Sequence, residues 1–400
     1  YGDHRDLHLS LRRQRQMCIR DSISTGVRAP RTGTRRAPSL EVDAMTEQLL
    51  LAMLDTVGCS VSNNISKLLD SGGSPSIDVE CKEIPDLDSG ISMLDSGEAD
   101  MLAVPASIVH GRRMELLQAG LEIVGARTPQ RPYSLLVSDN KLQYQPKSAI
   151  ILCEHKLIRR QLRRARRGIR ILDPSAYSSI SGSDSPPEDP ISLIRWMEGL
   201  RDSGEIDGFV TQREVYDAAG LMSRRHSLLP DPQNAGEPHF LPMPYSDLVV
   251  LIARRMFPVS ISEQISEKEG ETCWWIQDNL IGALDEGMLG KTGILARHRQ
   301  VRSLIKQAEE TRDLVLEQVC QDPDGEVKED EVHVEIRIEY VSKDGKKTVS
   351  LHRVIRYSEY ERATIASLRD WEILIKETSR EVPKDFHTDL DTPSFISLDD

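Results

Sequence analysis

The chain has 400 residues, a formal net charge of −13 and a pI of about 5.4. This length predicts two or three domains, and the acidic charge argues against general binding to nucleic acid or to an anionic membrane. No apolar run approaches the roughly 20 residues of a membrane span. We expect a monomer without a metal site. The cysteines are scattered without a CxxC pair, which favours a reduced, cytoplasmic protein without a zinc knuckle. They are Cys18, Cys59, Cys81, Cys153, Cys273 and Cys320.

The amino-terminal region divides into a leader and the start of the fold. Residues 1–22 are not a signal peptide, because no apolar core follows the arginines, and we expect this leader to be non-native or disordered. A short strand and a polar turn are expected after Gly26. The apolar residues that follow have helical spacing and predict a helix. They are Leu40, Ala44, Leu50, Met53 and Leu54.

Strands and helices then alternate, which is typical of α/β proteins. We expect a strand at 76–84, a short helix at 90–96 and a buried parallel strand at 99–104. The rhythm restarts with a strand at 148–153, a helix at 156–167 and a strand at 169–172. A helix at 191–203 and a strand at 207–211 complete it. The segment 175–190, between the strand at 169–172 and the helix at 191–203, is rich in Ser, Pro and Gly and predicts a mobile, exposed loop.

The last third has a different pattern. Residues 331–341 alternate, which predicts a strand with one apolar face and one polar face. The turn 342–345 ends in glycine and predicts a hairpin to a partner strand at 348–357. A helix at 360–377 follows, so this region reads as α+β. His298, His333 and His352 are expected at the surface. The acidic segment 382–400 predicts disorder.

Several short motifs, in order, resemble the hydroxymethylbilane synthase (porphobilinogen deaminase) family over about residues 26–378. Gly33-Thr34-Arg35 with Ser39-Leu40 is similar to the family's G-T-R-x-S-x-L. The stretches 97–104 (GEADMLAV), 132–138 (PYSLLVS) and 158–161 (IRRQ) resemble G-E-I-D-x-A-V, P-R-D-A-L-V-S and L-R-R-Q. Residues 204–207, 220–221 and 240–244 (FLPMP) follow with matching spacing. Each motif is weak by itself, and the shared order indicates a divergent member of this family.

The resemblance implies a fold of two periplasmic-binding-protein-like α/β domains joined by crossover hinges, plus a small α+β carboxy-terminal domain. The α/β, α/β, α+β rhythm of the sequence agrees with it. The hinges are expected near 125–131 and 241–247, with a ligand cleft between the first two domains. Domain 1 would comprise 26–125 and 245–261, domain 2 residues 131–241 with the insertion 175–190, and domain 3 residues 262–381.

The resemblance also shows which catalytic groups are missing. The family's catalytic aspartate position falls on Val109, which cannot transfer a proton. Its cysteine, the covalent anchor of a dipyrromethane cofactor, falls on Met288, whose thioether has no proton to lose. Cys320 lies in a similar local sequence, but it is 75 residues after Tyr245 and Met288 is 43. The family spacing favours Met288, and we expect no bound cofactor.

Arginines are the candidate ligand-binding residues, because guanidinium groups pair with carboxylates in a bidentate fashion. The resemblance points to Arg35, Arg159 and Arg160, and Arg163 lies on the same predicted helix. Residues 156–170 carry a dense basic stripe, which is either a solvated face, an anion site or a docking surface. The resemblance therefore implies a hydroxymethylbilane synthase-like protein of tetrapyrrole biosynthesis that binds an acidic, pyrrole-like ligand in the interdomain cleft, with porphobilinogen polymerisation in doubt. The alternative is a non-catalytic anion-binding or adaptor protein that uses the helix 156–170.

Overall fold

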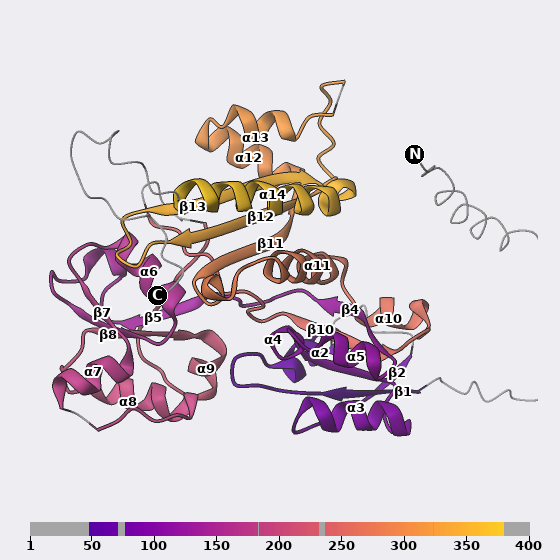
Figure 1. Cartoon of the computed structure of the whole chain (residues 1–400), viewed down its shortest axis with the longest axis horizontal. Helices are drawn as coiled ribbons and strands as arrows, with labels where there is room; N and C mark the ends of the chain where they lie inside the picture. Colours follow the sequence, from indigo (N-terminus) through magenta and orange to yellow (C-terminus); the bar gives the residue numbers. More distant parts are fainter. Residues whose placement is uncertain (1–47, 71–76, 183, 232–236, 323, 380–400) are drawn as a thin grey trace, which may run out of the picture. The chain divides into compact units, whose positions relative to one another are not determined.

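The computed structural model describes residues 48–70, 77–182, 184–231, 237–322 and 324–379 (Figure 1). The expectations for the leader 1–22, for Arg35 and for the tail 382–400 therefore lie outside the described residues. The described residues form two five-stranded mixed sheets and one three-stranded antiparallel sheet, which Figure 1 shows flanked by helices.

The first sheet has the strand order β2-β1-β3-β10-β4. Its three first strands are parallel, and β10 is antiparallel to both β3 and β4. The strands are β1 (Gln48–Met53), β2 (Asp78–Glu83), β3 (Met101–Pro105), β4 (Leu121–Arg127) and β10 (Val249–Arg254). The accompanying helices are α2 (Val61–Asp70), α3 (Leu87–Ser96), α4 (Ala106–Val109), α5 (Arg113–Gln118) and α10 (Val259–Ile265).

Three of the elements expected here are confirmed, and one is wrong. The strands expected at 76–84 and 99–104 are β2 and β3, and the helix expected at 90–96 is part of α3. The helix expected around Leu50, Met53 and Leu54 is instead strand β1. A continuous apolar run fits a strand buried between two neighbours as well as a helix face, and the pairing with β2 and β3 decides for the strand.

The second sheet has the strand order β7-β6-β8-β5-β9, again with parallel and antiparallel neighbours. Its strands are β5 (Ser134–Ser138), β6 (Ile150–Cys153), β7 (Arg170–Leu172), β8 (Gly208–Gln212) and β9 (Arg225–Ser227). Its helices are η1 (Leu142–Tyr144), α6 (Lys156–Ala165), α7 (Pro174–Ser181), α8 (Pro190–Asp202) and α9 (Arg213–Ala218).

The segment 175–190 differs from the expected loop, because helix α7 occupies its first half. Asp173 accepts a hydrogen bond from the backbone of Ser175, and Pro174 opens the helix, so the start is well capped. Gly182 ends it in the left-handed conformation. The many serines of the segment suggested a loop. The aspartate and proline at the start of α7 and the glycine at its end are the residues that indicate a helix.

The chain crosses between the two sheets twice. It leaves β4 for β5 through residues 128–133 and returns to β10 after residue 241. Asp247, in the returning segment, accepts hydrogen bonds from the backbone N–H groups of Gln130 and Arg131 at 2.8 and 2.5 Å. The strand that follows each crossing, β5 or β10, pairs antiparallel with both of its neighbours. The two crossings and this arrangement make this a periplasmic-binding-protein-like α/β fold, as expected.

The carboxy-terminal region is α+β, also as expected. Its antiparallel sheet has the order β11-β12-β13 and includes the expected hairpin. The strands are β11 (Thr292–Gln300), β12 (Val332–Val341) and β13 (Thr348–Arg356). The helices are α11 (Lys268–Gly282), η2 (Glu286–Met288), α12 (Val301–Thr311), α13 (Leu314–Val319), η3 (Tyr357–Glu359) and α14 (Tyr360–Ser379).

Both faces of strand β12 are buried. Val334, Ile336 and Ile338 belong to a core cluster with Trp371 of α14 and with residues of the first sheet. The polar face is covered too, and His333 is only 1% exposed. The expectation that His333 lies at the surface is therefore wrong. A polar face of a strand can be buried when each charged group finds a partner, which is the case here.

Candidate functional site

The two positions expected to carry the chemistry of the family are buried in the core. Val109 ends helix α4 and is 1% exposed. Met288 ends the short helix η2 and is 2% exposed. Its backbone carbonyl accepts a hydrogen bond from the hydroxyl group of Thr292. Both side chains belong to the same hydrophobic cluster. Neither can act as a base or nucleophile, so these positions serve packing.

Cys320 does not offer a reactive thiol in their place. It lies at the end of α13, where it packs with Val301, Leu304 and Leu316. Burial raises the pKa of the Cys320 thiol above its ordinary value. Because the thiolate is the nucleophile, a raised pKa disfavours an attachment role.

Of the four arginines expected to bind a ligand, the three that the structure describes lie on α6, and all three donate to other groups of the protein. Arg159 donates to the carbonyls of Cys153 and Glu154 and pairs with Asp173. Arg160 donates to the carbonyl of Val341 at 3.0 Å and lies over the ring of Tyr340. Arg163 donates to the carbonyls of Lys343 and Ile171 at 2.8 and 3.1 Å.

Two further arginines of this basic stripe are also engaged. Arg164 pairs with Glu339 of β12 and donates to the carbonyl of His239 at 2.6 Å. Arg166 donates to the carbonyl of Gln145. Arg167 and Arg170 are exposed. The stripe thus joins the second sheet region to the three-stranded sheet, and most of its charge is used inside the molecule.

The first and second sheets approach each other at the turn after β1. A side chain at Gly58 would place its Cβ 2.5 Å from Oε1 of Gln212, at the end of β8. Val57 packs against the core of the second sheet. At this point the two sheet regions touch directly, and a ligand between them would have to lie elsewhere along the contact.

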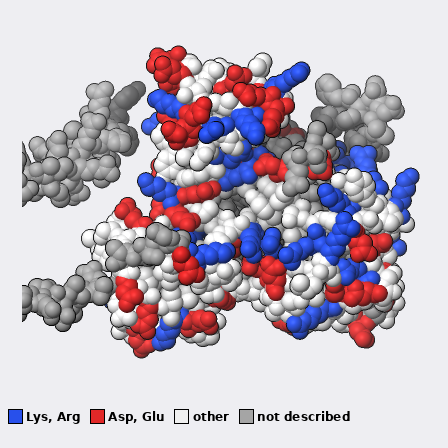
Figure 2. All heavy atoms as spheres, turned by 180° about the vertical axis from the view of Figure 1, so that it is seen from behind, with Lys and Arg blue, Asp and Glu red and all other residues white. Residues whose placement is uncertain are grey.

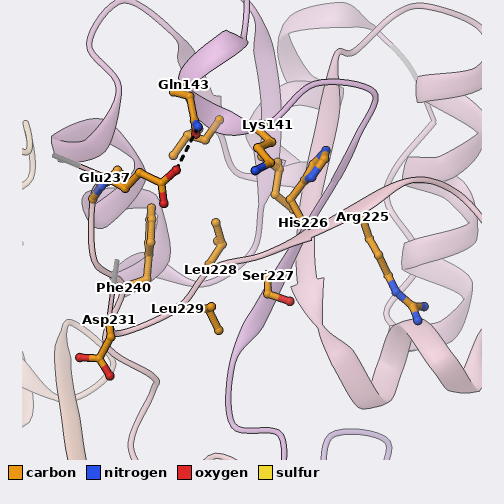
Figure 3. Close-up of a pocket in the computed structure, with 13 residues that line it drawn as sticks. Lys141, Gln143, Arg225, His226, Ser227, Leu228, Leu229, Asp231, Glu237 and Phe240 are labelled. Carbon is orange, nitrogen blue, oxygen red and sulfur yellow. Dashed lines mark hydrogen bonds between the residues drawn. The ribbon is translucent and has the colours of Figure 1, made fainter. Parts of the chain in front are cut away.

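A cavity of about 280 Å³ lies beside β9, the edge strand of the second sheet (Figure 3). Backbone hydrogen bonds from Leu228 to Ser134 and from Phe240 to Leu229 hold its two walls. Apolar side chains line one part of it, namely Leu136, Leu142, Leu228, Leu229 and Phe240. Polar and charged side chains line the rest, namely Lys141, Gln143, Arg225, His226, Ser227, Asp231 and Glu237.

The basic groups of this cavity are not all neutralised. Lys141 has no ion-pair partner among the described residues, and it is exposed. Arg225 pairs with Asp217 at 3.1 Å and lies over the ring of Tyr216. On the acidic side, Asp231 is held by Arg297 and Arg337, and Glu237 accepts a hydrogen bond from Gln143 at 3.3 Å. The cavity therefore offers a lysine whose charge is free to meet an anion.

His226 adds an unusual neutral group. Burial and the charges of Arg224 and Lys141 lower the pKa of His226. A hydrogen bond with the backbone of Ser138 opposes this shift. Its Nε2 atom is buried and has no hydrogen-bond partner among the described residues. The backbone N–H of Ser138 already donates to the carbonyl of Arg224, so the carbonyl of Ser138 accepts from the ring. Nδ1–H is then the donor, and Nε2 is left as an acceptor. A buried unsatisfied acceptor favours a ligand that brings a donor.

The sequence analysis missed Lys141, Arg225 and His226. The signal available was the basic triplet 224–226 in an acidic chain, one residue before the apolar pair Leu228-Leu229. Figure 2 shows that basic side chains gather locally on one face of the molecule in spite of the net charge of −13. Local charge, rather than net charge, is what a small anion meets.

Other features bear on cofactors and membranes. Among the residues that the structure describes, no group of three His, Cys, Asp or Glu side chains could hold a metal ion. None of the helices formed by these residues combines the length and apolar character needed to cross a lipid bilayer.

Comparisons with known proteins give only distant likenesses. No family model and no curated protein matches the chain. Among solved structures, the regulatory domain of OxyR2 from Vibrio vulnificus is 14% identical, with a TM-score of 0.30, and covers 60% of this chain and 99% of its own. The lipoprotein Tp32 from Treponema pallidum is 12% identical, with a TM-score of 0.29, over 56% of this chain and 92% of its own.

A ligand-binding component of an ABC-type import system from Staphylococcus aureus is 11% identical, with a TM-score of 0.29. It covers 82% of this chain and 92% of its own. Likenesses at this level assign no function to the chain, so the functional argument rests on the residues described above.

Proposed function

We propose that this protein is a non-catalytic binding protein for a small acid of the pyrrole carboxylate class, and that the cavity beside β9 is its site. The observation that carries the proposal is the buried Nε2 acceptor of His226 next to Lys141, in a cavity whose other part is lined by apolar side chains. A cytoplasmic location and a monomeric state remain predictions.

The chemistry of the cavity supports this ligand class. A flat heteroaromatic ring can be buried against Leu136, Leu228 and Phe240, where removal of apolar area from water is favourable. A ring N–H group can donate to His226 Nε2 if the side chains that cover this atom shift on binding. A carboxylate on the ring can pair with Lys141 in a charge-assisted hydrogen bond. A pyrrole that carries acid side chains has all three features.

The absence of catalytic groups at the expected positions supports binding without turnover. The hydroxymethylbilane synthase reaction needs a thiolate anchor and an acid–base carboxylate. Met288 and Val109 occupy the positions that correspond by sequence, and both are packed in the core. A member of the family that lost these groups could retain recognition of the substrate while losing its conversion.

Calorimetric titration of the full chain with porphobilinogen tests the proposal. We expect saturable binding, and we expect Lys141→Met to weaken it about tenfold, since that factor equals 1.4 kcal/mol and charge-assisted hydrogen bonds are of this size. Lys147→Met is the matched control, because Lys147 is also exposed in the same region but does not line the cavity. No binding, or equal loss in both variants, contradicts the proposal.

A pair of simpler probes tests the role of His226. Pyrrole-2-carboxylate and furan-2-carboxylate have similar shape and charge, but only the pyrrole has an N–H donor. We expect the furan to bind more weakly, because it leaves Nε2 of His226 without a partner. Equal affinity for the two probes would remove His226 from the account and leave only the charge of Lys141.

A further inference from the structure

The first sheet ends in a strand whose outer edge is only partly covered. Strand β4 pairs with β10 on one side, and none of the strands formed by the described residues pairs with its other side. At its carboxyl end, the N–H group of Ala126 donates to the hydroxyl of Ser266, and the carbonyl of Ala126 accepts the N–H of Glu267 at 2.9 Å. These bonds cover the edge of β4 at Ala126. They do not cover the portion of the edge from Leu121 to Gly125.

The backbone of this remaining portion presents hydrogen-bonding groups outward. Arg255 donates to the carbonyl of Gly120 across the pair of strands. Because backbone groups alternate in direction along an antiparallel strand, those of Leu121 and Ile123 point away from β10. An edge with free N–H and C=O groups is a template for another extended chain.

A groove of about 560 Å³ lies along this same portion of β4. It is walled by β4 itself, by helix α5 and by helix α11 of the carboxy-terminal region. Three aromatic side chains, all half-buried, form the far wall: Trp274, Trp275 and Tyr360. Trp275 and Tyr360 meet edge to face, with ring centroids 5.4 Å apart. Such fixed aromatic surfaces suit the side chains of a bound segment.

The charges of the groove indicate what kind of segment fits. Glu122, Glu271 and Asp278 line it, and its one lysine or arginine is Arg113. Arg113 already pairs with Asp278 at 3.1 Å, so the other two carboxylates give the groove an acidic excess. Lysine or arginine side chains would complement that excess, and acidic side chains would be repelled.

We propose that this groove binds an extended, basic segment of a partner protein, which adds to the β4 edge as a further strand. Backbone bonds to Leu121 and Ile123 supply register, aromatic walls hold the alternate side chains, and Glu122 and Glu271 select for positive charge. The site is separate from the cavity beside β9, and its occupant is a peptide rather than a small acid, so the two proposals stand or fall independently.

Fluorescence anisotropy with a labelled peptide of the sequence Lys-Val-Lys-Val-Lys tests this on the full chain. Two peptides of the same length serve as controls: one with Glu in place of each Lys, and one with N-methyl groups on both Val residues. We expect saturable binding of the basic peptide and at least about tenfold weaker binding of each control, since one lacks the positive charge and the other lacks the backbone donors of its two Val residues.

A variant pair locates the site. Glu271→Lys reverses a charge on the groove and is expected to weaken the basic peptide about tenfold. Glu263→Lys is the control, because Glu263 is exposed on α10 outside the groove. Equal binding of the acidic peptide, or no effect of Glu271→Lys, would overturn the proposal. So would sedimentation showing a dimer that the basic peptide does not disrupt, because a second copy would then occupy the edge.

Discussion

Arg337 donates from Nη2 to Oδ1 of Asp231 across 2.8 Å. Arg337 lies on β12 of the carboxy-terminal sheet, and Asp231 lines the candidate cavity beside β9. Arg297 binds the other carboxylate oxygen of Asp231 at 2.6 Å. One wall of the proposed site is therefore held by the three-stranded sheet, which couples ligand binding to the docking of that sheet.

Replacing Asp231 tests this coupling. Asp231→Asn removes the charge that Arg297 and Arg337 share, and we expect the free energy of unfolding to fall by about 1–3 kcal/mol, the size of hydrogen bonds to charged groups. Ligand affinity at the cavity should fall as well. Urea unfolding measures the first effect, with Asp95→Asn as an exposed control. A variant as stable as the wild type would show that the sheet does not depend on this contact.

Acid should unfold the protein through the buried carboxylates of β12. Burial alone would raise the pKa of Glu335, but the hydrogen bond with His352 and the charges of Arg297 and Arg337 outweigh it and hold this pKa well below 4.5. A lowered folded-state pKa stabilises the protein above the ordinary glutamate value, and this contribution is lost as pH falls below it. The pKa of Glu339 is lowered in the same way, by His239 and Arg164 against burial.

The measurement is urea unfolding of the wild type and Glu335→Gln between pH 7 and pH 3. We expect the wild type to lose stability steeply below about pH 4.5 and the variant, less stable at pH 7, to show a shallower dependence. Parallel curves would indicate that other groups control the acid sensitivity.

The hairpin turn should be sensitive to a single methyl group. A Cβ at Gly345 would lie 2.5 Å from the backbone nitrogen of Arg164 on α6, and Gly345 has a φ of +71°. Gly325 has a similar φ of +81° and nothing within 4 Å, so it isolates backbone strain from collision. We expect Gly345→Ala to destabilise by about 1–3 kcal/mol more than Gly325→Ala, as overpacking does. Thermal unfolding of both variants decides, and equal losses would mean that the turn yields without cost.

The cysteines should react in an order set by burial. Among the five described cysteines, Cys81 is exposed and the others are buried. Burial raises the pKa of the Cys153 thiol to about 12, and it also raises the pKa of both Cys81 and Cys320, so exposure rather than pKa separates these two thiols. Peptide mapping after iodoacetamide treatment should find Cys81 modified first and Cys320 modified only on unfolding. Modification of Cys320 at the rate of Cys81 would reopen its role as a nucleophile.

Sequence patterns predicted most of the elements, because their signals are local. Alternation predicted β12 and β13, with the turn before Gly345, and apolar runs flanked by turns predicted β3 and β6. Strand β1 was misassigned, because an apolar run such as 49–54 fits a buried strand or a helix and only the neighbouring strands decide.

The candidate site was less predictable, because its residues converge through tertiary contacts. The basic stripe of α6 suggested a ligand site. In the structure, Arg160 donates to the carbonyl of Val341 and Arg164 pairs with Glu339, and both partners are far away in sequence. Lys141 precedes η1, which follows β5, and His226 lies on β9. The two side chains come together only because β9 pairs with β5. Neither relationship has a local pattern in the chain.

Mass spectrometry of the full chain after incubation with porphobilinogen tests the central claim most directly. Measured under native conditions, the mass should increase by one bound ligand. Measured after denaturation, it should equal that of the polypeptide alone, and no linear tetrapyrrole should form. A covalent dipyrromethane that survives denaturation, or turnover of porphobilinogen, would contradict the account.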